Sequence, residues 1–120
     1  MAGHIDKGRK GEELARQYLL DRQWKILEQN WRSSHREIDI IAEHDGKLII
    51  VEVKVRRSIG AERLEEHIPR AKQRRLIRAA GAYLKWKKLD AELRFDVILI
   101  TGEPGQYEIE HIEDAFSAWD

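Results

Sequence analysis

The sequence predicts a single α/β domain, in which a mixed β-sheet with a central antiparallel hairpin is flanked by helices. Three observations support this prediction. The 120 residues match the size of one domain, and residues 1–120 show no linker or internal repeat. Apolar and polar residues alternate on both sides of the dipeptide Asp45-Gly46. One segment before this hairpin and one after it repeat apolar residues at helical spacing.

The first expected elements are a helix over residues 6–22 and a short strand over residues 24–31. Asp6 suits the N-cap position, where its side chain can accept a hydrogen bond from a free backbone N–H. One stripe of this helix carries Gly11, Glu12, Ala15 and Leu19. Glu12 is therefore expected to face the sheet, and Glu13 to point toward solvent.

A hairpin is expected over residues 37–55, because Asp-Gly favours a two-residue turn with positive φ at both positions. This turn places residue 39 opposite residue 52, and residue 37 opposite residue 54. Side chains alternate along a strand, so one face carries Ile38, Ile40, Ala42, Ile49, Val51 and Val53. The other face carries Glu37, Asp39, Ile41, Ile50, Glu52 and Lys54. A slip of one residue would scramble this sorting, so the pattern supports the register.

The second half of the chain predicts one long helix, two strands and a short terminal helix. The long helix begins at Pro69, whose ring suits the first helical turn, and its apolar stripe includes Leu76 and Ala80. In chain order, the expected elements are a loop over 56–66, a helix over 69–87, a strand over 94–100, a turn over 102–106, a strand over 107–112 and a helix over 113–119.

Asp39 and Glu52 form the candidate site, because the expected register makes them cross-strand neighbours. Their Cβ atoms would lie roughly 5 Å apart, and two like charges at that distance repel by about 3 kcal/mol at an effective dielectric of 20. A divalent cation such as Mg²⁺ would convert this repulsion into ligation. Lys54 is spaced to reach a water or phosphate bound there. The alternative is a solvated strand face with a ladder of salt bridges.

The charges allow a polyanionic partner despite a formal net charge of zero, with 22 basic and 22 acidic residues. Residues 1–102 hold 22 basic and 16 acidic residues, a net charge of +6. Arg56 and Arg57 adjoin the candidate site and are the first phosphate-binding candidates. The second helix adds a basic row, with Lys72 a candidate to approach the site. That row contains Arg70, Arg74 and Arg78. The alternative for the row is a solvated helix face.

Composition excludes several classes of site. The absence of cysteine excludes disulfides, thiolate zinc sites and a cysteine nucleophile. The five histidines show no zinc-ligand spacing. There is no apolar N-terminal run, and no segment approaches the ~20 apolar residues of a membrane span. A cytoplasmic location without a membrane partner is therefore expected.

The segments EIDIIA (37–42) and VEVK (51–54) resemble the core of the PD-(D/E)XK nuclease superfamily, which has the restriction-endonuclease-like fold. The whole chain resembles more closely the YraN family of small bacterial proteins, which are similar to archaeal Holliday junction resolvases. Arg36 stands where that family usually has Gly, and Val55 where it usually has Thr. The segments that carry the family resemblance are GRKGEELARQYL, ILEQNWRSSHREIDIIA, LIIVEVKVRR, AKQRRLIRAAGAYL and RFDVILI.

The resemblance implies a catalytic role for each site residue and a Mg²⁺ or Mn²⁺ cofactor. Asp39 and Glu52 would bind the metal together with the carbonyl oxygen of Val53. Lys54 would orient the attacking water or stabilise charge on the phosphate. Glu12 would add a further acidic group; the alternative is a boundary glutamate paired with a neighbouring arginine.

The leading functional hypothesis is a metal-dependent nuclease that hydrolyses phosphodiester bonds in DNA, with branched or flap-like substrates as candidates. Lys72 and Arg74 join Arg56 and Arg57 as expected nucleic-acid contacts. One alternative is a nucleic-acid-binding module of the same fold with little or no cleavage. Another is an interaction protein that uses the acidic C-terminal segment and exposed tryptophans. The analogy with resolvases also suggests a homodimer.

Overall fold

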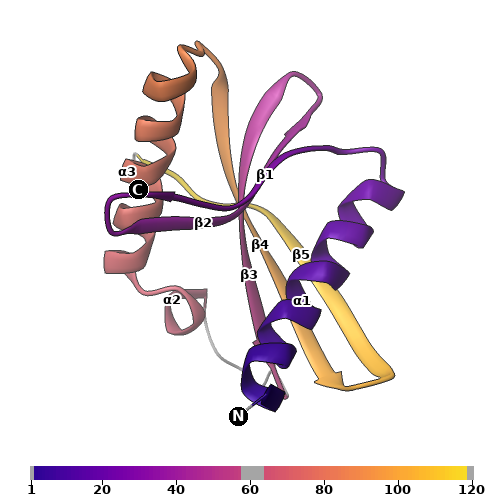
Figure 1. Ribbon diagram of the computed structural model, residues 1–120. Coiled ribbons are helices and arrows are strands. Elements are labelled where there is room, and N and C mark those ends of the chain that lie inside the picture. The colour runs from indigo at the N-terminus through magenta and orange to yellow at the C-terminus, as the bar shows by residue number, and fades with distance from the viewer. Residues whose placement is uncertain (1, 58–63, 119–120) are drawn as a thin grey trace.

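The computed structural model describes residues 2–57 and 64–118 of the protein. Five strands form one mixed sheet in the order β1-β2-β3-β4-β5, in which only β3 and β4 are parallel neighbours (Figure 1). The elements are α1 (Ala2–Asp21), β1 (Lys25–Ser33), β2 (Arg36–His44), β3 (Lys47–Arg56), α2 (Leu64–His67), α3 (Arg70–Lys87), β4 (Glu92–Glu103) and β5 (Gln106–Phe116). The predicted single α/β domain with a mixed sheet is confirmed.

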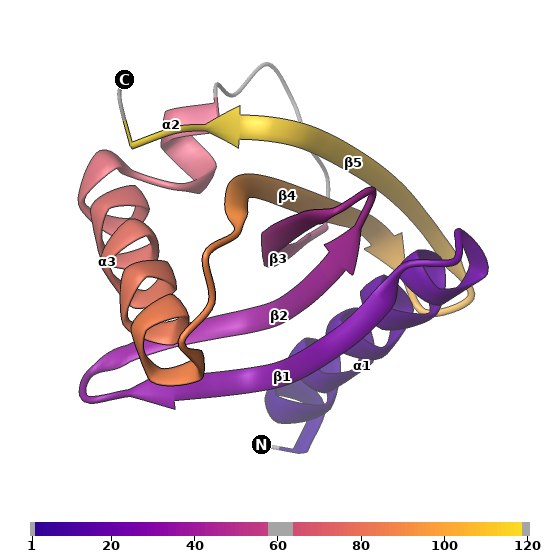
Figure 2. The same cartoon turned by 90° about the horizontal axis from the view of Figure 1, so that it is seen from above.

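The helices lie on opposite faces of the sheet. In Figure 2, α3 lies within the curve of the sheet and α1 lies outside it. The α1 core joins Ala15 and Leu19 to alternate residues of β2, β3 and β4. The α3 core packs Leu76, Ala80 and Tyr83 against the other face of the same strands. Because β3 and β4 have helices on both faces, apolar residues dominate along both strands.

The central hairpin has the predicted register over most of its length. Ile40 pairs with Val51 and His44 with Lys47, around a turn in which Asp45 and Gly46 both have positive φ. The ladder ends at the Ile40–Val51 pair, and beyond it β2 turns away from β3 (Figure 1). This bend changes the expected faces, because Ile38 packs in the α3 core instead of joining Ile40 in the α1 core.

The C-terminal segment corrects a second prediction. Residues 113–116, expected to begin a helix, continue β5 as far as Phe116. Phe116 is buried opposite Phe95, with the two rings stacked at a centroid distance of 5.1 Å. Burying this pair favours the strand over the weak local helical pattern. Residue 119, the last of the predicted helix, lies outside the described residues.

The segment between β3 and α3 also differs from the prediction. Residues 56–66 were expected to form a loop, but Arg56 ends β3 and α2 begins at Leu64. Residues 58–63 lie outside the described part of the chain. None of the helices in the described ranges combines the length and apolar character that a membrane crossing requires.

Candidate functional site

Asp39 lies at the point where β2 and β3 separate. Its Oδ2 accepts a hydrogen bond of 2.9 Å from the backbone N–H of Val53. A side-chain carboxylate thus replaces the backbone carbonyl that a continued ladder would have provided to β3. The strand separation leaves Asp39 between the strands, beside the first residues of β3 that follow the ladder.

The carboxyl of Asp39 is half-buried and has little favourable charge around it. Burial, followed by repulsion from Glu52, raises the pKa of Asp39 from 3.8 to about 7. The hydrogen bond from Val53 lowers the pKa, but hydrogen bonding with Glu52 and the charge of Glu12 raise it further. Asp39 and Glu52 are therefore close, as predicted, although the regular ladder stops one pair before them.

Glu52 is the most buried carboxylate of the site, with 3% of its surface exposed. Lys54 Nζ lies 3.3 Å from its Oε2, and Lys72 Nζ lies 3.5 Å from the same oxygen. Lys54 comes from the same strand, whereas Lys72 extends from the first turn of α3. The two ammonium groups stabilise a carboxylate that would be costly to bury alone. The expected approach of Lys72 to the site is confirmed.

Glu12 faces the site from α1. It is half-buried, whereas Glu13 is exposed, as the helical pattern predicts. A Cβ at Gly11 would overlap the side chain of Val55, so the glycine permits a close approach of α1 to β3. This close packing places the charge of Glu12 within electrostatic range of Asp39.

Glu37 does not take part in the site. It lies opposite Arg32 of β1, and the two side chains form an exposed ion pair of 3.5 Å. The expected cross-strand pairing of Glu37 with Lys54 is wrong, because the β2–β3 ladder ends at the Ile40–Val51 pair and does not extend to Glu37. Lys54 pairs with its strand neighbour Glu52 instead.

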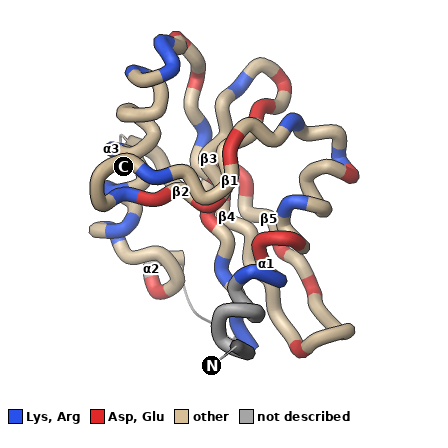
Figure 3. The backbone as a smooth tube through the Cα atoms, in the orientation of Figure 1, with Lys and Arg blue, Asp and Glu red and all other residues tan. Residues whose placement is uncertain are grey.

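The predicted phosphate contacts separate into two groups. Lys72 reaches the buried carboxylate of Glu52. Arg56 is half-buried and lies two residues after Lys54 on β3, where it donates a hydrogen bond of 2.9 Å to the carbonyl oxygen of Val55. Arg57 is exposed and pairs with Glu103 at 3.3 Å, and Arg74 is exposed on α3. Figure 3 shows acidic residues where β2 crosses β3 and basic residues along α3.

A divalent metal ion could use two carboxylates here, from Asp39 and Glu52. Within residues 2–57 and 64–118, no group of three or more His, Asp or Glu side chains is arranged to hold a metal ion. An ion would therefore depend on the two carboxylates, a backbone oxygen such as that of Val53, and water. Such an oxygen set suits Mg²⁺, which usually keeps several waters and takes only one or two carboxylates.

A second buried carboxylate, Asp96 of β4, was not recognised from the sequence. Arg94 donates to it twice, at 2.9 and 2.8 Å, and His111 donates at 2.7 Å. The backbone N–H of Asp114 adds a bond of 3.0 Å. Burial alone would raise the pKa of Asp96, but the bonds from His111, Arg94 and Asp114 outweigh burial and lower it. The signal in the sequence was an Arg-x-Asp pair within an apolar strand.

Known proteins similar to this chain cover nearly its whole length. The UPF0102 protein of Flavobacterium psychrophilum is 42% identical over 116 residues, which are 97% of this chain and 98% of the relative. The UPF0102 proteins of Bacteroides thetaiotaomicron and Phocaeicola vulgatus are 41% and 40% identical, each over 97% of this chain and 96% of the relative. Residues 11–100, which span Glu12 and the whole hairpin, match the family profile. The chain therefore belongs to the uncharacterised protein family UPF0102, in agreement with the YraN resemblance.

Proposed function

We propose that the protein is a nuclease, dependent on Mg²⁺ or Mn²⁺, that hydrolyses phosphodiester bonds in DNA. The observation that supports this most strongly is the burial of Glu52 next to Asp39, with Lys54 and Lys72 beside it. An acidic pair with a lysine on the same strand also fits the resemblance to the PD-(D/E)XK superfamily. Similarity to resolvases makes branched DNA the first substrate to test.

Each side chain has a role that follows from its position. The chemistry that a bound Mg²⁺ or Mn²⁺ supplies is Lewis acidity toward a phosphoryl oxygen. Asp39 and Glu52 present the carboxylate oxygens for the ion, and their mutual repulsion favours an added cation. Lys54 and Lys72 hold ammonium groups at the same site, where either can donate to a phosphate oxygen. Glu12 adds negative charge from α1.

Cleavage assays test this proposal directly. Wild type should cleave at least one member of a panel of branched, flapped, single-stranded and duplex DNA in Mg²⁺ or Mn²⁺, and not in EDTA. Glu52→Gln and Asp39→Asn keep the side-chain shapes and should abolish cleavage while binding continues. Equal cleavage by wild type and both variants, from independent preparations, would assign the activity to a contaminant or another site.

The DNA-binding part of the proposal has its own measurement. Replacing both Arg56 and Arg57 by Gln should reduce the salt dependence of duplex binding, because each lost phosphate contact lowers the slope by about 0.9. Arg16→Gln, an exposed change on α1, is the matched control. If the salt dependence of binding were unchanged in the double variant, the DNA would have to bind at another surface than the end of β3.

A DNA-binding module without cleavage is the second candidate. Lys54 and Lys72 both contact Oε2 of Glu52, so the buried charge is already balanced by the chain. Such a module would bind DNA equally in EDTA and in Mn²⁺, and would leave every DNA of the panel intact. Under this alternative, Glu52→Gln should change stability but not the dependence of binding on metal.

A further inference from the structure

An aromatic cluster, formed by Trp31, Tyr83 and Trp86, lies where the C-terminal end of α3 meets β1. The ring centroids of Trp31 and Tyr83 are 5.2 Å apart, and each lies 6.0 Å from the Trp86 ring. Tyr83 is buried and donates a hydrogen bond of 3.1 Å to Glu28 of β1. The cluster is therefore a fixed part of the fold.

Trp86 is exposed in spite of this support, with 61% of its surface open to solvent. A large indole that is both held by neighbours and exposed presents a preformed surface for a planar ligand. Lys87 places its Nζ 4.8 Å from the centre of the Trp86 ring and 3.7 Å from Glu28. A positive charge thus lies over the Trp86 ring itself, in a cation–π arrangement.

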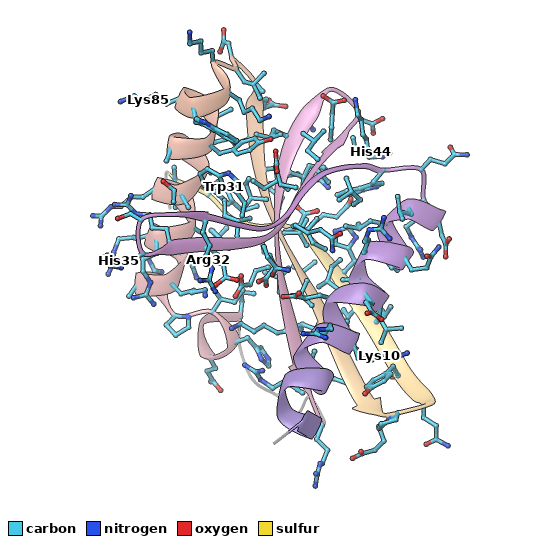
Figure 4. The ribbon with its side chains drawn as sticks, in the orientation of Figure 1. Lys10, Trp31, Arg32, His35, His44 and Lys85 are labelled. Atoms are coloured by element: carbon cyan, nitrogen blue, oxygen red, sulfur yellow. The ribbon has the colours of Figure 1, made fainter. Side chains whose placement is uncertain are left out.

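A row of exposed cations runs along α3, roughly 100° around the helix from the position of Trp86. Arg74, Arg78 and Lys85 share one stripe of the helix, and Lys85 projects from its outer side (Figure 4). In the described part of the chain, none of the three has an acidic partner. Lysines at the end of a helix offset its dipole, but Arg74 and Arg78 lie in its first half, where that explanation does not apply.

The spacing connects the aromatic cluster to the candidate site. Lys72, which contacts Glu52, and Trp86 are separated by about four turns of the same helix, roughly 21 Å along its axis. Four turns return to nearly the same helical face. At about 3.4 Å for each stacked nucleotide, this distance corresponds to roughly six nucleotides.

We propose that α3 guides a single-stranded segment away from the Glu52 site, with Arg74, Arg78 and Lys85 on phosphates and an unpaired base stacked on Trp86. This inference rests on the proposed action on DNA and specifies the substrate as a duplex or junction with a single-stranded tail of about six nucleotides. A stacking surface lined by cations matches a nucleic-acid strand, which offers both π faces and negative charge.

Binding in EDTA tests the inference without requiring cleavage. The probes are a fluorescein-labelled 12-base-pair DNA duplex, blunt or with a single-stranded tail of about six nucleotides. Wild type should bind the tailed probe more tightly. Trp86→Ala should weaken tailed binding about tenfold, because stacking contributes on the order of 1–3 kcal/mol per base, and should leave blunt binding unchanged. Trp86→Phe should recover most of the loss, and Leu89→Ala, a change at another exposed apolar residue near the end of α3, should behave as wild type.

Three outcomes would overturn the inference. Trp86→Ala could leave tailed binding unchanged, or it could weaken blunt and tailed binding equally. Alternatively, it could convert a dimer into a monomer in sedimentation without changing DNA affinity, which would identify the cluster as an interface between two copies. If Trp86→Ala selectively weakened tailed binding but wild type cleaved no DNA in Mn²⁺, the binding of a single-stranded tail along α3 would be supported and the nuclease proposal refuted. The two proposals can therefore fail separately.

Discussion

Two buried carboxylate centres occupy neighbouring positions in the sheet but have opposite surroundings. Asp96 pairs with Val51 in the β3–β4 ladder, so it lies beside the residue that precedes Glu52. Asp96 accepts four hydrogen bonds and has a lowered pKa. Asp39 accepts one from Val53, faces Glu52, and has a raised pKa. Asp96 is fully buried and Asp39 is half-buried, so burial alone would raise the pKa of Asp96 as well. The sign of the neighbouring charges sets the opposite directions of the two pKa shifts.

The comparison separates a structural carboxylate from a candidate functional one. Asp96 satisfies Arg94, His111 and a backbone N–H, and it ties β4 to the end of β5. Its charge is fully balanced by the chain and has no need of a ligand. Asp39 has excess negative charge around it, which an added cation would neutralise. Perturbed acids of the second kind are the ones that gather at functional sites.

The largest expected effect is on stability, from removing the charge at Asp96. Asp96→Asn removes a fully buried carboxylate from the half-buried Arg94 and from His111, and leaves Arg94 only its exposed partner Glu113. This change should lower the free energy of unfolding by about 3–5 kcal/mol. Asp39→Asn, the matched change at the other centre, should leave stability in EDTA equal to wild type or higher. Chemical denaturation at pH 7 measures both. Similar losses in the two variants would show that the centres do not differ as described.

The pH dependence of stability should have opposite signs at the two centres. The raised pKa of Asp39 means that the folded state binds its proton more tightly than the unfolded state does. Its contribution is therefore complete below pH 3.8 and is lost as pH rises through about 7. Asp96, with a lowered pKa, contributes above pH 3.8 and loses that contribution as pH falls through its folded pKa.

Denaturation curves across pH, in EDTA, check these signs. Between pH 4 and pH 7, wild type should lose about 2–4 kcal/mol relative to Asp39→Asn. Asp96→Asn should show the same loss of stability between pH 4 and pH 7, because Asp39 is unchanged in this variant. It should not show the decline in stability that wild type shows in strong acid. If the free energy of unfolding changed with pH in the same way in wild type and in Asp39→Asn, the raised pKa of Asp39 would be refuted.

A smaller effect is expected from adding metal. An ion that binds only the folded state at ten times its Kd stabilises by about 1.4 kcal/mol, which raises the melting temperature by roughly 4–8 °C. Mn²⁺ should produce this shift in wild type and not in Glu52→Gln. Asp96→Asn should keep the shift, since the carboxylate of Asp96 is already bound by Arg94 and His111 and does not belong to the proposed metal site. A melting temperature insensitive to millimolar Mn²⁺ in wild type would favour the DNA-binding module.

Local patterns predicted the parts of the site that depend on strand and helix periodicity. The Asp45-Gly46 turn gave the correct register from Ile40 to Val51, and helical spacing placed Glu12 inward. The end of the ladder could not be predicted, because it depends on how β2 curves around α3. The change of face at Ile38 has the same cause.

Long-range contacts account for the remaining errors. The spacing of the histidines in the sequence indicated no role for His111, because it meets Asp96 only once β4 and β5 pair. Phe116 is held in a strand by Phe95, a neighbour far away in the chain. In both cases, tertiary packing decides a structure that the local sequence leaves ambiguous.

The hydrogen bond from Val53 to Asp39 gives one backbone proton of β3 a distinct exchange behaviour. Amides in a regular ladder exchange with solvent deuterium only when neighbouring strands open together. The Val53 amide is held by a side chain, so rotation of one carboxyl group releases it while the sheet stays intact. The exchange rate of the Val53 amide therefore follows the local motion of the Asp39 carboxyl group. Measuring this rate would report the dynamics of the candidate site separately from global unfolding.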